Sequence, residues 1–114
     1  MKKIKYLIFL FLLFPYIVMA SSEDKINKID VKIELSLNGD AHIIETWDAY
    51  AGSGSEFYKA LYNLGNMSVS NFKVTDESGT DYDFVTDWDI NASMSEKKYK
   101  NGFNYASEGL ELCW

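Results

Sequence analysis

Two adjacent segments near the start of the chain alternate between apolar and polar residues. From Ile29 to Leu37 every second residue is apolar, and charged or polar residues stand between them. This period of two is typical of a strand that buries one face. An Asn-Gly-Asp sequence at 38–40 follows, and glycine tolerates the positive φ that tight hairpin turns require. The pattern therefore predicts a β-hairpin whose second strand spans residues 41–49.

The rest of the chain carries weaker strand signals. Residues 50–66 fit helical and strand spacing alike, and their aromatic residues favour an extended segment. We expect a strand at Ser68–Thr75 with a bulge near Asn71. A hairpin turn should follow at 76–79. After that turn we expect a short strand whose apolar residues are Tyr82, Phe84 and Val85.

The last part of the chain reads as polar turns followed by one strand. Residues 91–107 are polar and turn-rich, and Gly109 to Trp114 starts another apolar strand. Short strands with glycine at the turns predict an all-β fold, an antiparallel β-sandwich of the immunoglobulin-like kind. A strand that ends the sequence without a closing turn predicts an incomplete domain. Its open edge would need a protein partner or other cover.

The first twenty residues have the features of a signal peptide. Three lysines precede an apolar stretch of fifteen residues, Tyr6 to Ala20, which is shorter than a bilayer span needs. We expect a signal helix and cleavage after Ala20, which leaves a domain of residues 21–114. An uncleaved membrane anchor and a buried core helix are the alternatives. The prediction is export, either to the extracellular face of the cell membrane or, if the chain truly ends at Trp114, into the medium.

Composition and charge exclude several classes of function. The 114-residue chain has 11 lysines, no arginine and 17 acidic residues, a net charge of −6. Without a basic cluster, nucleic acid is a poor partner, because duplex affinity depends on cations that neutralise phosphates. One cysteine and one histidine exclude a disulfide framework and a histidine-based metal cluster. We found no motif for a cofactor and expect none.

Several short segments, in order and spacing, resemble a known family over residues 29–114. The family is the one called domain of unknown function 2207, which consists of predicted bacterial membrane proteins, and the similarity is to its N-terminal exofacial region. The resemblance implies a leader, an extracellular β-rich domain and a membrane anchor that is missing here. It implies no activity and no catalytic residue. The matching segments are Leu37–His42, Glu45–Asp48, Phe57–Lys59, Tyr62–Gly65, Trp88–Ser93 and Leu110–Trp114.

The resemblance also raises the question of a disulfide. Similar proteins often have a second cysteine near the position of Asn101, which could pair with the one that matches Cys113. Asn101 leaves Cys113 without that partner. An odd exported cysteine is either buried as a small hydrophobe or free to pair between chains.

Acidic residues supply two candidate sites, and both have a plainer interpretation. The run Asp87 to Asn91 is spaced like the start of a calcium loop, but Ala92 replaces the required glycine and Lys98 the bidentate glutamate. Solvated turn carboxylates explain it better. Glu45 and Asp48 are the nearest candidates for a hydrolase pair, which needs two carboxyl groups across a cleft. We interpret Glu45 instead as a strand carboxylate on the Trp47 face, at an edge or paired with a lysine such as Lys59.

Four aromatic residues could form a surface that binds sugars or proteins, although strand aromatics are more often core. They are Trp47, Tyr58, Tyr62 and Trp88. The sequence as a whole predicts a non-enzymatic extracellular β domain of a bacterial membrane protein. One alternative is a small secreted binding protein that acts by strand addition or through the aromatic surface. The other is a carboxylate-dependent hydrolase.

Overall fold

A computed structural model describes residues 23–114; the predicted leader, its helix and its cleavage site lie outside the described residues. Within this range the regular secondary structure is almost all strand, with one helix of four residues, which confirms the all-β prediction. No helix among the described residues has the length and apolar character needed to cross a membrane. Two compact units meet in sequence between Ser53 and Gly54, and each is described by itself.

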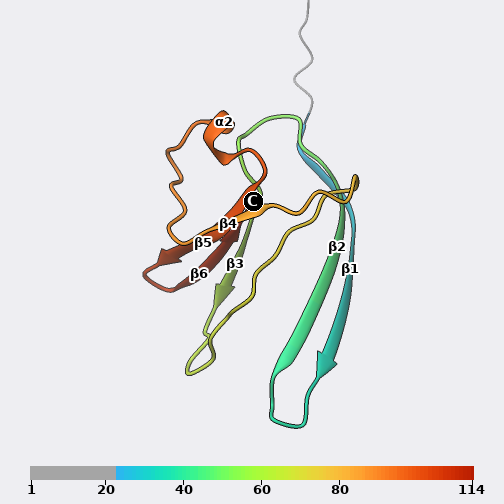
Figure 1. Ribbon diagram of the computed structural model, residues 1–114, viewed down its shortest axis with the longest axis vertical. Helices are drawn as coiled ribbons and strands as arrows, with labels where there is room; N and C mark the ends of the chain where they lie inside the picture. The colour runs from blue at the N-terminus through green and yellow to red at the C-terminus, as the bar shows by residue number, and fades with distance from the viewer. Residues whose placement is uncertain (1–22) are drawn as a thin grey trace, which may run out of the picture. The chain divides into compact units, whose positions relative to one another are not determined.

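The first unit is the predicted β-hairpin (Figure 1). Strand β1 (Lys25–Leu35) pairs antiparallel with β2 (Ala41–Tyr50), and only a bulge between Ile26 and Lys28 interrupts the register. The turn closes where the amide of Ser36 donates to the carbonyl of Asp40 over 2.9 Å. Gly39 supplies the positive φ of +93° that this loop needs. The hairpin prediction is confirmed, although β1 starts four residues before Ile29.

The hairpin is amphipathic along β1. Charged side chains share one face, where Lys28 and Asp30 form an ion pair of 2.8 Å and Lys32 and Glu34 one of 2.7 Å. Successive side chains of a strand point to opposite faces, so the apolar residues from Ile29 to Leu35 share the other face. Every residue of β1 is exposed.

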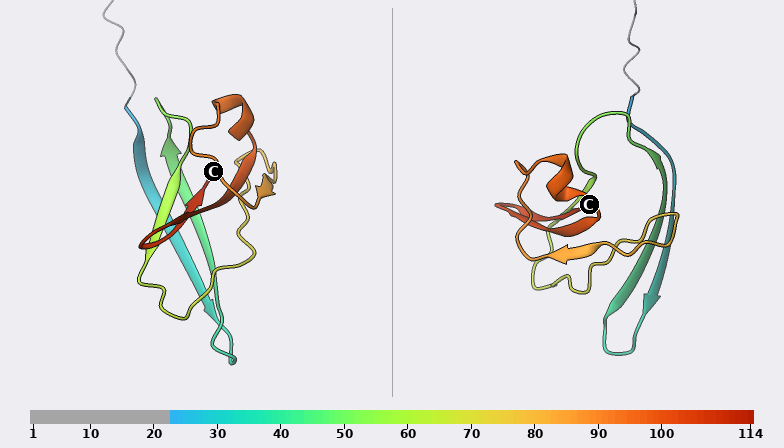
Figure 2. Two further views of the ribbon diagram at one scale, coloured as in Figure 1. Left: turned by 90° about the vertical axis from the view of Figure 1, so that its left-hand side faces the viewer. Right: turned by 45° about the horizontal axis from the view of Figure 1, so that its top comes forward.

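The second unit is a four-stranded sheet with the order β3-β6-β5-β4 (Figure 2). The strands are β3 (Tyr58–Tyr62), β4 (Asp83–Val85), β5 (Lys100–Ala106) and β6 (Gly109–Cys113). β6 pairs antiparallel with both β3 and β5, whereas β4 pairs parallel with β5. The sheet is therefore mixed, and the prediction of purely antiparallel pairing is wrong for β4. A parallel pair needs a crossover connection, and here it contains the short helix α2 (Met94–Lys97).

β6 lies inside the sheet, so the predicted open edge at Gly109–Trp114 is wrong. Both sides of β6 are paired, and Trp114 exchanges two further backbone hydrogen bonds with Phe57, of 2.7 and 3.0 Å. The partner on one side is β5, which falls within the segment predicted as turns. Its apolar pattern is interrupted by Asn101, Gly102 and Asn104, so the sequence does not predict this strand. The edge strands of this sheet are β3 and β4, and β6 needs no external partner for its edge.

The strand predicted at Ser68–Thr75 is also absent from the structure. Only Thr75 forms a bridge, with Asp81, on either side of the predicted turn at 76–79. Asn71 has a φ of +56°, a left-handed conformation that ends any extended run. The apolar residues there pack against the sheet instead of forming a strand. The ring centroid of Phe72 lies 5.9 Å from that of Phe103 in β5.

The core of the second unit is small. The buried apolar residues are Trp88, Phe103, Leu110 and Cys113. Two polar residues, Lys97 and Asn101, are buried with them. Burying a polar group costs free energy unless it is hydrogen-bonded, so the partners of these two side chains matter for stability and for function.

Candidate functional site

Within the second unit, the structure buries one of the aromatic residues predicted to form a surface and exposes two others. Tyr58 and Tyr62 stand at the two ends of β3 with 60% and 58% of their surface exposed. They share one face of this edge strand, because positions four apart in a strand point the same way. Trp88 is only 7% exposed and belongs to the core. Trp47 is half-buried in the hairpin unit, where its indole N–H donates to Glu45 over 2.9 Å.

Trp88 is the centre of a buried polar cluster that the sequence did not predict. Its indole Nε1 donates to Oε2 of Glu56 over 2.7 Å. The same oxygen lies 2.8 Å from the ammonium of Lys97. The side chain of Lys97 is 5% exposed and that of Glu56 19%, so the ion pair is largely removed from water. We call these three residues the Trp88 cluster.

Lys97 uses all three of its N–H groups in this position. Besides the bond to Glu56, its ammonium donates to the carbonyl of Ile90 over 2.8 Å and to the hydroxyl of Ser55 over 3.3 Å. An ammonium group has three donors, and each is occupied. Lys97 therefore joins three segments of the second unit: α2, the loop before it and the start of the unit.

A capping box holds Lys97 in place, since Lys97 is the last residue of α2. The hydroxyl of Ser93 accepts from the amide of Glu96, and the carboxylate of Glu96 accepts from the amide of Ser93 over 2.9 Å. Hydrogen bonds from Ser93 lower the pKa of the Glu96 carboxyl. The spacing S-x-x-E at 93–96 is a recognised helix start and could have predicted α2 from the sequence. No such signal marks Lys97 or Glu56.

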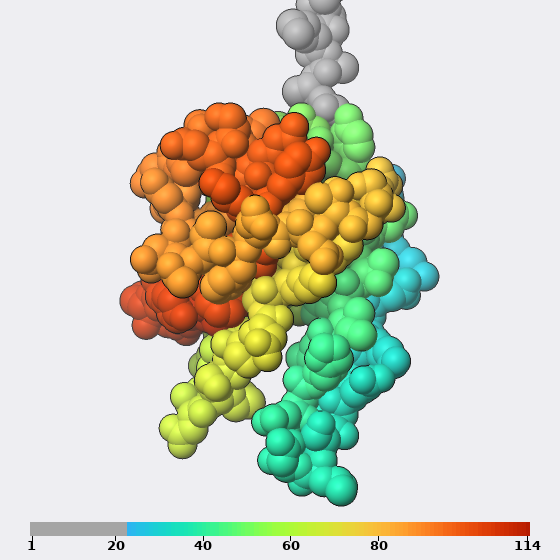
Figure 3. All heavy atoms as spheres, viewed as in Figure 1, coloured from blue at the N-terminus to red at the C-terminus, as the bar shows by residue number. Residues whose placement is uncertain are grey.

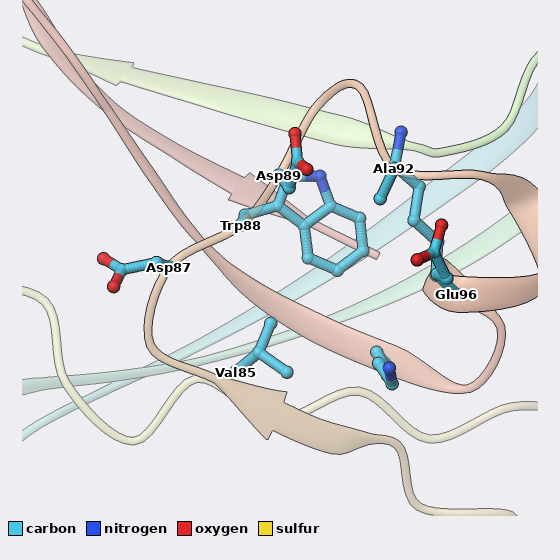
Figure 4. A pocket seen from close by; sticks show the side chains of 8 residues that line it. Val85, Asp87, Trp88, Asp89, Ala92 and Glu96 are labelled. Carbon is cyan, nitrogen blue, oxygen red and sulfur yellow. The ribbon is translucent and has the colours of Figure 1, made fainter.

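A pocket of about 220 Å³ lies beside the indole ring of Trp88 (Figure 4). The carboxylate of Asp87 points away from the ring, and that of Glu96 is engaged in the helix cap. The deepest polar group, Lys97, is saturated by its protein partners. The pocket thus combines small apolar surfaces with a charged rim. Its lining residues are Val85, Asp87, Trp88, Asp89, Ala92, Glu96, Lys97 and Lys100.

The acidic residues of the second unit stabilise turns. Asp76 accepts hydrogen bonds from the hydroxyl and amide of Ser78 and from the amide of Thr80, and these bonds lower its pKa. Asp89 likewise accepts from the amide of Asn91 over 2.8 Å. Among residues 23–114 no three metal-ligating side chains gather in one place. The interpretation as turn carboxylates accounts for these contacts.

The two carboxylates of the candidate hydrolase pair lie on opposite faces of the hairpin. Glu45 pairs in register with Val31 on the apolar face and accepts from the indole of Trp47. Asp48 pairs with Lys28 on the charged face. Two carboxyl groups that act on one glycosidic bond must face the same cleft. The hairpin does not bring Glu45 and Asp48 together in that way.

Cys113 is buried and forms no disulfide. Gly102 lies directly opposite it in the β5–β6 register, so the neighbouring Asn101 points to the other face of the sheet. There the Asn101 amide donates to the carbonyl of Phe72 over 3.1 Å. A cysteine at position 101 would therefore point away from Cys113. Of the two states that we expected for an odd cysteine, the structure shows the buried one.

The thiol of Cys113 is expected to react slowly in the folded protein. Burial and the nearby carboxylates of Glu56 and Glu111 raise its pKa from 9.0 to about 11, so the reactive thiolate is scarce at pH 8. Labelling with a thiol reagent should be at least tenfold slower than in denaturant. Because the pKa is raised, the contribution of Cys113 to stability is lost as the pH rises from 9 towards 11. Equal labelling rates with and without denaturant would contradict the buried position.

Comparison of the chain with family models, with curated proteins and with solved structures gives no match. The function therefore has to be argued from the sequence and from the contacts described above.

Proposed function

We propose that the chain is exported and forms a non-enzymatic extracellular β domain of a bacterial membrane protein of the domain of unknown function 2207 family. One observation favours a structural or binding role over an enzyme. In the Trp88 cluster, the buried groups that could do chemistry are bonded to one another: Glu56 accepts from both Trp88 and Lys97. A catalytic group needs a polar atom directed at a substrate, whereas Oε2 of Glu56 and the three N–H groups of Lys97 are bonded within the domain.

The proposal includes an immunoglobulin-like β-sandwich. The hairpin supports it, because its apolar face remains exposed within its own unit, with 53% of Val31 and 59% of Ile33 accessible. A two-stranded hairpin alone is marginally stable in water, and a sheet with one apolar face normally forms one layer of a larger β structure.

Export can be tested by thiol labelling, because the buried Cys113 should react slowly and contribute little signal. Ser107 is exposed in the turn between β5 and β6, so a Ser107→Cys variant places one reactive thiol on the surface. A membrane-impermeant maleimide should label this variant in intact bacteria as fully as in lysed ones, while the unchanged chain stays near background. N-terminal sequencing of the labelled protein should give Ser21 as the first residue. Labelling that requires lysis would overturn the proposal.

A secreted binding protein is the second candidate, and the exposed pair Tyr58 and Tyr62 favours it. Exposed tyrosines supply a large contact area with a polar tip, and these two stand at the ends of β3, an edge strand of its sheet. Retention on cell-wall polysaccharide that is lost in a Tyr58→Ser, Tyr62→Ser variant would support this candidate. Tyr99→Ser, which removes another half-exposed tyrosine, is the matched control.

A further inference from the structure

Among residues 23–114, no strand pairs with the outer edge of β1, and the order of charges along this strand is unusual. Within its sheet β1 pairs only with β2, and its register is regular from Lys28 to Leu35. In Figure 3, β1 (blue to cyan) forms the right-hand side of the hairpin, and β2 (green) lies to its left. Along its charged face the signs alternate strictly, as Lys28, Asp30, Lys32 and Glu34. An unpaired edge of this length is a template for another strand.

We propose that this edge pairs with β1 of a second copy of the chain, antiparallel and centred on Val31. In that register Lys28 lies opposite Glu34 of the second copy, and Asp30 lies opposite Lys32. By symmetry each contact occurs twice, so four cross-strand ion pairs form on the charged face. Opposite charges placed directly across two strands stabilise the pairing.

The order of charges selects this register over its neighbours. A shift that centres the pair on Asp30 sets Asp30 against itself and Lys28 against Lys32. A shift in the other direction sets Lys32 against itself and Asp30 against Glu34. Both shifts oppose like charges, which destabilises a strand pair. Both of those shifts change the register by two residues. A register change of only one residue would place charged residues opposite apolar ones on the same face.

The apolar face continues across the same pairing. Ile29 lies opposite Ile33 of the second copy, and Val31 lies opposite Val31. A two-fold axis perpendicular to the sheet relates the copies, so both apolar faces are on one side. The result is a four-stranded sheet with the order β2-β1-β1-β2, which is large enough for independent stability where one hairpin is not. The outer edge of β2 has no equivalent row of alternating charges, because Ile44 and Thr46 stand on the face that pairs with the charged residues of β1.

Charge reversal tests the proposal with two variants of the complete chain. The acidic variant, Lys28→Glu with Lys32→Glu, carries four negative charges along β1. The basic variant, Asp30→Lys with Glu34→Lys, carries four positive charges at positions 28, 30, 32 and 34, besides Lys25 at the start of β1. We expect the unchanged chain to be a dimer by light scattering, each variant alone to be a monomer with its dimer Kd raised at least 100-fold, and the equimolar mixture to form a heterodimer.

The mixture also controls for folding, because a variant that had lost its hairpin could not recover pairing. Molar salt should weaken the unchanged dimer, since it screens exposed charges over about 3 Å. A monomeric unchanged chain at about 100 μM would overturn the proposal. So would variants that dimerise alone as tightly as the unchanged chain, or a mixture that stays monomeric while both variants show strand content by circular dichroism.

Cross-linking tests the register. Val31→Cys in a Cys113→Ala background places two thiols opposite each other on the two-fold axis, so mild oxidation should convert most of the protein to a disulfide-linked dimer. Leu35→Cys is the matched control on the same face. In the proposed register its two copies lie eight residues apart along the strands, roughly 26 Å at 3.3 Å per residue, and should not cross-link. Equal cross-linking of the two variants would overturn the register.

Discussion

Replacing Lys97 by methionine should destabilise the second unit by about 3 kcal/mol. The change removes the cation that lies 2.8 Å from Glu56 and leaves this largely buried carboxylate with the indole of Trp88 as its remaining partner in the cluster. It also removes the donor of the Ile90 carbonyl. Urea unfolding followed by tryptophan fluorescence measures the effect, because Trp88 lies within the cluster.

The neighbouring residue provides the control. Lys98 is exposed, and its ammonium lies 4.9 Å from the ring centroid of Tyr99, so Lys98→Met should cost less than about 1 kcal/mol. The double variant Lys97→Met with Glu56→Gln should lose less than Lys97→Met alone, because no buried charge is left unpaired. A loss below about 1 kcal/mol for Lys97→Met would show that the ion pair does not stabilise the fold.

Gly102→Ala should destabilise the second unit by a similar amount, about 3 kcal/mol. A Cβ at this position would lie 2.6 Å from the backbone oxygen of Val85 and 3.3 Å from the indole of Trp88. The oxygen belongs to β4, which is held by its pairing with β5 and cannot move away. Thermal unfolding monitored by circular dichroism should show a lower Tm with unchanged baseline spectra.

Gly79→Ala separates steric overlap from glycine's backbone freedom. A Cβ at Gly79 would meet no atom within 4 Å, but its φ of +84° still favours glycine. We expect a loss of about 1 kcal/mol there, which is the backbone contribution alone. If Gly102→Ala lowers the free energy of unfolding by no more than Gly79→Ala does, then β4 and β5 do not approach each other as closely as described.

The parts of the fold that the sequence revealed are those where one physical rule decides the structure. In the hairpin, alternation fixes the faces and Gly39 fixes the turn, so both strands were predicted correctly. β5 was missed because several of its buried positions hold residues that are not apolar. Asn101 bonds to Phe72, and Gly102 is small to admit Val85, so polar and small residues occupy positions where the rule expects apolar ones.

The candidate site was harder to predict than the fold. Trp88 was predicted as part of a binding surface, yet it is buried and bonded to Glu56, which lies 32 positions away in the sequence. Lysine is almost never fully buried unless it is paired, and nothing near Lys97 in the sequence shows its partner. A contact of this kind follows from tertiary packing alone. The capping box at Ser93 is the one local signal that pointed towards it.

The central position of β6 affects when the second unit can fold during synthesis. β3 and β5 both lie before β6 in the sequence, and β6 is the strand that joins them. β3 must wait some fifty residues for its partner, a non-local pairing that slows folding. Until Cys113 has been made, the strand that pairs with both β3 and β5 is incomplete. Before β6 is made, the second unit would stay unfolded, the state in which a polypeptide can be threaded through a membrane channel.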